Sequence, residues 1–188
     1  MLYLIRHAHT QRTALPVETW PLSDLGRRQA QQLAELPFWQ DVQVVCASVE
    51  PKALQTAQIV AERRDLPVEP IFDLRELRRP GGPVDDYESA VRQAFNNPTT
   101  SVNGWEPAGE AQTRIVTAIE RLLMLHEDET LAVVSHGLAL TLYLADLTGI
   151  APSLELWQSL SFASTIQVDP QARQILARFD SSGRSRRA

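Results

Sequence analysis

Short apolar runs alternate with helical patterns along this 188-residue chain, and this alternation is the feature that most restricts its fold. Three runs, Met1–Ile5, Val42–Ala47 and Leu131–Ser135, are long enough for one buried strand each and too short for a globular helix. Strands that alternate with helices predict a largely parallel sheet with right-handed crossovers. We therefore expect an α/β fold, a three-layer α/β/α sandwich with a largely parallel central sheet and helices on both faces.

The apolar residues between these runs are spaced for helices. Ser23 is a predicted N-cap, and Pro51 suits the first turn of the next helix. A short extended piece is expected at 68–72, and the alternation in 161–179 predicts a terminal hairpin that turns at Asp169-Pro170. The segments with helical spacing are 23–36, 48–64, 84–95, 110–126 and 137–147.

The middle of the chain differs in composition from both ends. Residues 78–109 contain Pro80-Gly81-Gly82-Pro83, one helical pattern and a turn-rich stretch. We interpret this segment as a small helical and loop insertion over the carboxyl edge of the sheet. The prediction is a single domain over residues 1–180, followed by a disordered basic tail at 181–188.

Composition narrows the classes of function. No apolar run approaches the length of about 18 residues that a membrane-spanning helix needs. The start of the chain does not read as a signal peptide, and the single cysteine, Cys46, excludes an internal disulfide framework and a cysteine-based zinc site. The cytoplasm is the expected location. A net charge of −5 argues against nucleic acid as the main partner.

Polar groups follow three of the predicted strands directly. Arg6-His7 ends the first, the segment Ser48 to Lys52 follows the second, and Ser135-His136 ends the third. Carboxyl ends of parallel strands share one edge of a sheet, where ligands bind in open α/β folds. Glu76, after the extended piece, is able to reach the same edge.

Two cations, two histidines and a helix amino terminus at one edge favour a bound phosphate. The sequence has no P-loop of the GxxxxGK[ST] type and no HExxH motif or aspartate cluster, so nucleotide-triphosphatase and metal-site interpretations are weak. Without a metal ion to activate water, direct attack on phosphorus by a side chain is the simplest alternative. We expect His7, kept neutral by neighbouring cations, to attack phosphorus while Arg6, Lys52 and His136 hold the phosphate oxygens and Glu76 moves the proton.

These residues resemble the histidine phosphatase superfamily, also called phosphoglycerate mutase-like. The matching blocks occur in family order, and they are Arg6-His7-Ala8-His9-Thr10, Pro21 to Ala30, Ser48 to Ala57 with Lys52, Glu76 in DLREL, and Val133 to Gly137. The resemblance implies that His7 accepts the phosphoryl group, that Arg6 and His136 bind phosphate, and that Glu76 donates a proton.

Three positions depart from the family pattern. Ala8 stands where the family usually has a glycine. Lys52 stands where an arginine is usual, and this replacement keeps the charge but loses the bidentate hydrogen bonding of a guanidinium. Thr13 falls where many members carry a phosphate-contacting asparagine, and its hydroxyl is a candidate phosphate ligand.

The leading hypothesis is a metal-independent phosphatase that hydrolyses a phosphomonoester through a phosphohistidine at His7, without a cofactor. The substrate is expected to be a small phosphorylated metabolite or a phosphoprotein, and no membrane partner is expected. A phosphoglycerate mutase-type phosphomutase is the first alternative, although the short middle segment favours hydrolysis. A weakly active phosphate-binding or phosphoprotein-binding module is the second alternative. Tyr87 and Trp105 are equally compatible with packing and with substrate contact.

Overall fold

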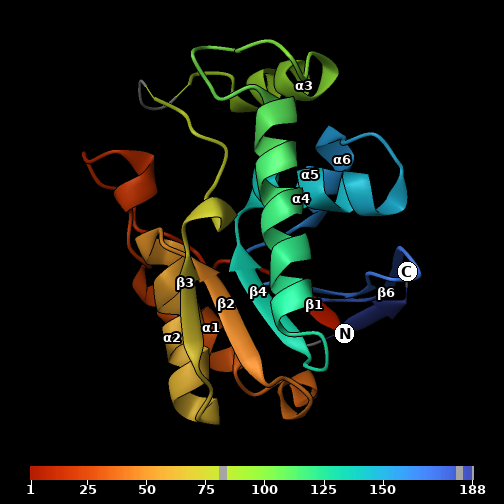
Figure 1. Ribbon diagram of the computed structural model, residues 1–188. Helices are drawn as coiled ribbons and strands as arrows, with labels where there is room; N and C mark the ends of the chain where they lie inside the picture. The colour runs from red at the N-terminus through yellow and green to blue at the C-terminus, as the bar shows by residue number, and fades with distance from the viewer. Residues whose placement is uncertain (81–83, 181–183, 188) are drawn as a thin grey trace.

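A seven-stranded mixed sheet forms the centre of the structure, a computed structural model that describes residues 1–80, 84–180 and 184–187. The strand order is β3-β2-β4-β1-β5-β6-β7 (Figure 1). The strands are β1 (Leu2–Arg6), β2 (Val44–Ser48), β3 (Val68–Ile71), β4 (Leu131–Ser135), β5 (Thr165–Asp169), β6 (Gln174–Phe179) and β7 (Ser185–Arg187).

The four strands β3, β2, β4 and β1 are parallel, as the sequence pattern predicts. Leu2 of β1 pairs with Leu131 of β4, and Arg6 pairs with Ser135, so β1 and β4 end side by side. Of the four strands, β1, β2 and β4 are apolar on both faces up to their last residue, whereas the edge strand β3 contains Glu69 and is only partly buried. In β1, Leu2 and Leu4 join one core cluster while Tyr3 and Ile5 join the other, because successive side chains point to opposite faces.

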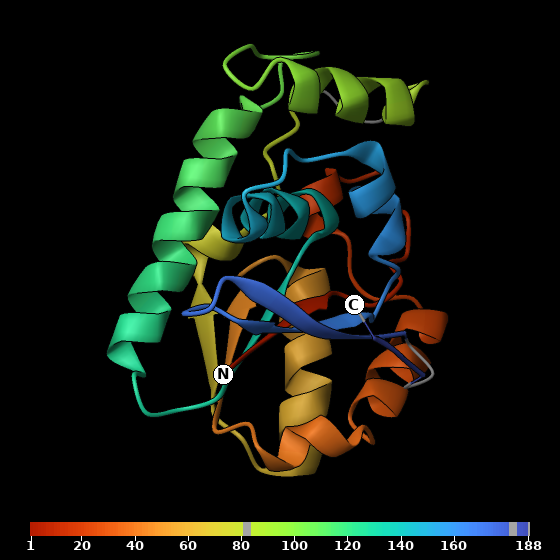
Figure 2. The ribbon, with the colours of Figure 1, turned by 90° about the vertical axis from the view of Figure 1, so that its right-hand side faces the viewer.

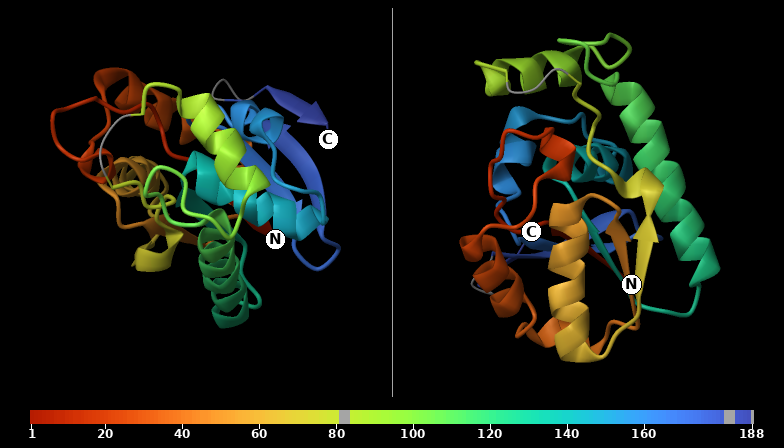
Figure 3. Two further views of the ribbon diagram at one scale, coloured as in Figure 1. Left: turned by 90° about the horizontal axis from the view of Figure 1, so that it is seen from above. Right: turned by 90° about the vertical axis from the view of Figure 1, so that its left-hand side faces the viewer.

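Helices cover both faces of the sheet, and the predicted sandwich is confirmed (Figures 2 and 3). Helices α1 and α2 contribute to one core cluster, and α3, α4 and α5 contribute to the other. The helices are α1 (Asp24–Leu33), α2 (Pro51–Arg64), α3 (Tyr87–Asn96), α4 (Ala108–Leu125), α5 (Gly137–Thr148) and α6 (Leu154–Ser159), with 3-10 turns η1 (Val17–Thr19), η2 (Pro37–Gln40) and η3 (Phe72–Leu74).

The predicted helix starts are confirmed by their caps. The Ser23 side chain accepts a hydrogen bond from the Gly26 amide at the start of α1, and Pro51 opens α2. The pattern did not predict α6 or the 3-10 turns, because such short elements carry too few residues to show a period. None of the helices in the described part of the chain combines the length and the apolar composition needed to cross a bilayer.

The end of the chain forms the antiparallel part of the sheet. The predicted hairpin is present as β5 and β6, and β5 pairs antiparallel with β1. The tail that was expected to be disordered contains β7, which pairs with β6. Residues 181–183 and 188 of that tail lie outside the described residues.

The middle segment lies over the carboxyl edge of the sheet, where α3 spans the top of the molecule (Figures 1 and 2). Asp86 caps α3 by accepting a hydrogen bond from the Ser89 amide. Trp105 is buried in the core cluster that α3 and α4 share, so the segment packs on the domain rather than standing apart from it. Of the Pro80-to-Pro83 stretch, residues 81–83 lie outside the described residues.

Candidate active site

The carboxyl end of β1 presents Arg6 and His7 at the rim of the sheet. His7 is 6% exposed, and its Nδ1 lies 2.8 Å from the carbonyl oxygen of Ala8. Because a carbonyl oxygen only accepts, Nδ1 carries the ring hydrogen. The neutral ring therefore keeps its lone pair on Nε2, the nitrogen that a nucleophile needs.

The second histidine follows β4 and precedes α5. The rings of His7 and His136 have centroids 5.1 Å apart at an interplanar angle of 61°. His136 is fully buried, its Nε2 lies 2.8 Å from Ser48 Oγ, and its Nδ1 has no hydrogen-bond partner among the described residues. The expected convergence of the three strand ends is confirmed, since β1, β2 and β4 each contribute one of these side chains.

Arg6 adds a guanidinium beside the two rings. Its Nη1 donates to the carbonyl oxygen of Leu160, its Cζ lies 4.4 Å from the ring centroid of Phe162, and its Nε has no partner among the described residues. A Cβ atom at Gly137 would lie 3.2 Å from Arg6 Cζ and 2.9 Å from Trp157 Nε1. A glycine at the first position of α5 therefore lets the guanidinium approach the amino terminus of this helix.

Lys52 is held in a buried ion pair. Its Nζ lies 2.5 Å from Glu50 Oε2 and donates to the Val17 carbonyl at 2.8 Å. The other Glu50 oxygen accepts a hydrogen bond from the Glu76 amide at 2.9 Å and lies 3.7 Å from His136 Nε2. The carboxylate of Glu50 thus offsets the charge of Lys52 inside the site.

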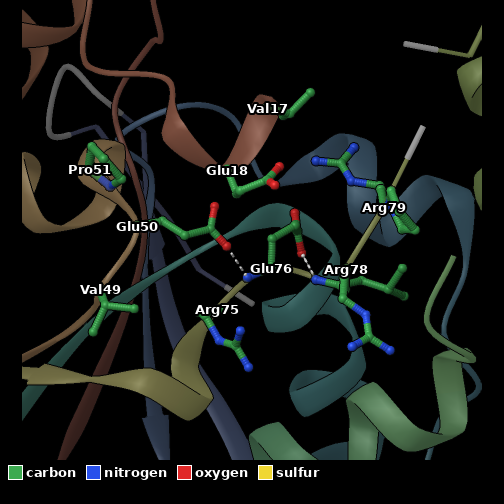
Figure 4. A pocket seen from close by; sticks show the side chains of 11 residues that line it. Val17, Glu18, Val49, Glu50, Pro51, Arg75, Glu76, Arg78 and Arg79 are labelled. Atoms are coloured by element: carbon green, nitrogen blue, oxygen red, sulfur yellow. Dashed lines mark hydrogen bonds between the residues drawn. The ribbon is translucent and has the colours of Figure 1, made fainter. Parts of the chain in front are cut away.

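Glu76 reaches the same place from the segment after η3. Its Oε1 accepts hydrogen bonds from the amides of Leu77 and Ala139 at 3.0 and 2.9 Å, and its Oε2 accepts one from the Leu138 amide at 3.2 Å. Amides of the first turn of α5 therefore fix the carboxyl group next to His136. Figure 4 shows the Glu50 and Glu76 side chains side by side at this edge.

The surroundings of the two histidines favour their neutral forms. Burial is the main cause that holds the pKa of His7 well below its usual range, and His136 is the next. The Ala8 hydrogen bond raises this pKa, and Arg6 and Lys52 lower it by smaller amounts. Burial and then Lys52 hold the pKa of His136 low as well. A neutral His7 is the form able to act as a nucleophile.

A cavity of about 710 Å³ opens above these groups. Arg6, His7, Lys52 and Glu76 all line it, and so does Thr13, whose Oγ1 accepts a hydrogen bond from the Leu15 amide. A smaller hollow of about 360 Å³ adjoins it and shares Glu76 as a wall (Figure 4). All the residues predicted for the site thus lie in or beside one cavity. Their individual roles remain predictions.

Several residues of the site were not singled out from the sequence. The sequence marks Glu50 only as a carboxylate two residues before Lys52, and this position does not by itself indicate a buried ion pair. Phe162 and Trp157 follow α5 in a region without a motif, yet both line the cavity. Ala8 is fully buried and has no positive φ, so this replacement of the family's usual glycine brings no backbone strain.

A potential metal site lies elsewhere. Among the described residues, one group of three ligand side chains is close enough to share an ion, and it comprises Cys46, Glu69 and His126, with ligand atoms within 4.8 Å of one another. It lies between β2, β3 and the end of α4. It includes none of the residues around His7.

The fold and the paired histidines at the carboxyl edge define a phosphate-handling α/β protein of the histidine phosphatase class. A profile of the histidine phosphatase superfamily (branch 1) matches residues 2–179, and the chain belongs to this superfamily. The resemblance noted from the sequence motifs is confirmed.

Relatives of the chain carry both mutase and phosphatase names. A probable phosphoglycerate mutase GpmB of Proteus mirabilis is 31% identical, and the alignment covers 94% of this chain and 87% of the relative. The adenosylcobalamin/alpha-ribazole phosphatase of Escherichia coli is 29% identical, with coverage of 83% and 82%. The alpha-ribazole phosphatase structure from Shigella flexneri is 26% identical with a TM-score of 0.64, covering 89% of this chain and 90% of that chain.

A mycobacterial glucosyl-3-phosphoglycerate phosphatase shares the fold at a TM-score of 0.72. It is 24% identical, and the superposition covers 89% of this chain and 92% of that chain.

Proposed function

We propose that the protein is a metal-independent phosphatase that hydrolyses a phosphomonoester through a phosphohistidine at His7. The observation that carries this proposal is the placement of His7, a buried imidazole that lines the cavity, with its Nδ1–H bonded to the Ala8 carbonyl and its pKa held low mainly by burial. A neutral imidazole is a competent nucleophile toward phosphorus. The phosphatases among the relatives support hydrolysis as the reaction.

The first step forms a bond between His7 Nε2 and phosphorus as the bond from phosphorus to the alkoxy oxygen breaks. Arg6 Nε and His136 Nδ1 are buried nitrogens without hydrogen-bond partners among the described residues, and they are the proposed donors to the phosphate oxygens. Because most of the work in phosphoryl transfer is positioning and neutralisation of charge, fixed donors are well suited to it. Lys52 and Thr13 are the proposed additional phosphate contacts.

Glu76 is the proposed proton donor in the first step and acceptor in the second. The protonated carboxyl gives its proton to the leaving alkoxide, and the product alcohol departs. The carboxylate then takes a proton from the water that attacks phosphorus, so inorganic phosphate and neutral His7 are regenerated. Oε2 accepts a single amide hydrogen bond, and we assign the proton transfer to this oxygen.

A phosphomutase is the alternative, and the mutase name of the relative at 31% identity favours it. Both reactions use the same phosphohistidine and differ in whether water or a second alcohol attacks it. The short segment 78–109 favours access of water. We further propose a small phosphorylated metabolite as the substrate and the cytoplasm as the location, which suits a chain with one free buried cysteine.

Turnover of 4-nitrophenyl phosphate in the presence of a chelator tests the proposal. We expect turnover by the wild-type protein and a loss of at least about 1,000-fold in His7→Ala, because the nucleophile is removed. Substantial residual activity in His7→Ala would reject His7 as the nucleophile. Conversion of 3-phosphoglycerate to 2-phosphoglycerate faster than its hydrolysis would favour the mutase, and no turnover of any phosphoester would favour a binding module.

A further inference from the structure

The wall of the main cavity is unusually aromatic for a chain with few aromatic residues. Three of the four tryptophans of the protein, Trp20, Trp105 and Trp157, line it together with Tyr87 and Phe162. We define the aromatic wall as Tyr87, Trp105, Trp157 and Phe162. These side chains come from three separate parts of the chain, the middle segment, α6 and the loop before β5.

Ring contacts join the wall into two groups. The centroid of Tyr87 lies 5.6 Å from that of Trp157 and 5.4 Å from that of Trp105. At the other end, the ring of Phe162 lies 5.5 Å from that of His7 and carries the Arg6 guanidinium at 4.4 Å. Both groups line the same cavity, one beside the nucleophile and the other at the start of α3.

Part of this surface is free to contact a ligand. Trp105 is buried and backs Tyr87, whereas Tyr87, Trp157 and Phe162 are only half-buried and line the cavity. The Tyr87 hydroxyl accepts a hydrogen bond from Arg79, whose Cζ also lies 5.2 Å from the centroid of the Tyr87 ring. Because a guanidinium lies over Tyr87 and another over Phe162, the half-buried ring of Trp157 is the main apolar face left for a ligand. Apolar ring faces in a cavity gain free energy when a planar apolar group covers them.

We propose that the alcohol part of the substrate is a planar aromatic or heteroaromatic group that stacks on the aromatic wall. This inference rests on the proposed function, since it names the substrate class of the same site. In-line displacement places the leaving oxygen opposite His7, so the alcohol part extends from phosphorus away from His7, within the cavity that Glu76, Tyr87 and Trp157 line. A polyhydroxylated alcohol would instead use the polar side chains that line the same cavity, such as Gln11 and Arg12, so the two alternatives predict opposite substrate preferences.

The test compares two esters with nearly identical leaving oxygens, 2-phenylethyl phosphate and 2-cyclohexylethyl phosphate, with sn-glycerol 3-phosphate as a polar comparator. We expect the wild-type protein to show a kcat/KM about tenfold higher for the phenyl ester than for the cyclohexyl ester, because stacking contributes beyond the area buried. Glycerol phosphate should be the poorest of the three. A ratio near one for the two ring esters, or a preference for glycerol phosphate, would overturn the inference and leave the phosphatase proposal intact.

Substitutions in the aromatic wall test whether its residues cause the preference for the phenyl ester over the cyclohexyl ester. Trp157→Leu and Tyr87→Leu should each bring the ratio close to one, while Trp157→Phe, which keeps an aromatic face, should retain most of it. Phe179→Leu on β6, an aromatic-to-leucine change that does not line the cavity, is the matched control and should leave the ratio unchanged. An unchanged ratio in both Trp157→Leu and Tyr87→Leu would overturn the assignment.

A binding measurement tests the aromatic wall independently of the proposed phosphatase chemistry. Calorimetry with folded His7→Ala protein measures the dissociation constants of the two ring esters without turnover. About tenfold tighter binding of the phenyl ester supports the aromatic wall even if the wild-type protein hydrolyses neither ester. Equal dissociation constants would overturn the inference even if the wild-type protein hydrolyses both.

Discussion

The buried pair of Glu50 and Lys52 gives the most informative perturbation, Glu50→Gln. Glutamine has almost the same shape and keeps one oxygen acceptor, for the Glu76 amide or for Lys52, so the change removes the charge and one hydrogen-bond acceptor. The two side chains are 7% and 4% exposed and lie 2.5 Å apart. The substitution therefore leaves an ammonium group without its counter-ion in a place with little access to water.

Removal of one partner of a buried ion pair costs about 3–5 kcal/mol, because the remaining charge keeps its desolvation penalty. Lys52 retains the Val17 carbonyl as an acceptor and lines a cavity that water can enter. We therefore expect the lower end of this range, a loss of about 3 kcal/mol in the free energy of unfolding. Such a loss is a large fraction of the stability of a typical domain, which is about 5–15 kcal/mol.

Urea unfolding at pH 7 measures this loss. The matched control is Glu35→Gln, the same substitution in the surface pair with Arg63, whose side chains are 65% and 52% exposed. The control should change the free energy of unfolding by less than about 0.5 kcal/mol. Lys52→Met should also destabilise, and the double variant Glu50→Gln/Lys52→Met should cost clearly less than the sum of the two single changes. A loss in Glu50→Gln as small as in the control, with additive single changes, would refute this reasoning.

The same variant reports on the phosphate site. Without Glu50, the charge of Lys52 is available to an anion in the cavity, and we expect the inhibition constant for inorganic phosphate to fall about tenfold. An unchanged constant would show that Lys52 does not contribute to the phosphate site.

Three other changes test the site. The free energy of unfolding should decrease as the pH falls below about 6.5, because the fold holds the pKa of His7 below its value in the unfolded chain, and the unfolded chain then binds more protons than the folded one. Urea unfolding at pH 7.0 and 5.5 measures this decrease. Equal free energies of unfolding at the two pH values would contradict it. Glu76→Gln should slow alkyl esters much more than aryl esters, since poor leaving groups need the proton most, and an equal loss for both would move the acid role elsewhere. Gly137→Ala should lower kcat/KM about 100-fold, because the added methyl group displaces Trp157 and the Arg6 guanidinium. Circular dichroism should show that the variant is folded. A kcat/KM equal to that of the wild-type protein would contradict the close approach of these groups to Gly137.

The parts of the structure that could be predicted from the sequence are those with a strong local pattern. The strands β1, β2 and β4 are apolar up to their last residue because both of their faces are covered, and the polar groups at their carboxyl ends lie at the sheet edge. The convergence of Arg6, His7 and His136 is a consequence of this topology. The hairpin of β5 and β6 was predictable for a related reason, because its residues alternate.

The unpredicted parts depend on contacts between distant segments. Glu50 precedes Pro51 at a helix start, where a carboxylate is usually solvated. It is buried here between Lys52, which the distant Val17 carbonyl also holds, and the Glu76 amide from another segment. The aromatic wall was only partly anticipated, since Trp157 stands in a helix of six residues that shows no period. The three-residue strand β7 has too little sequence to be recognised in a basic tail.

The central claim is that phosphorus becomes bonded to the Nε2 atom of His7 during turnover. Rapid acid-free quenching of the wild-type protein with a labelled phosphomonoester, followed by peptide mass spectrometry under alkaline conditions, identifies the modified residue directly. We predict a base-stable, acid-labile phosphoryl group on the peptide that contains His7, at residue 7, and its absence in His7→Ala. A phosphoryl group on another residue, or turnover by the wild-type protein with no phosphoenzyme formed on the timescale of a single cycle, would contradict the account.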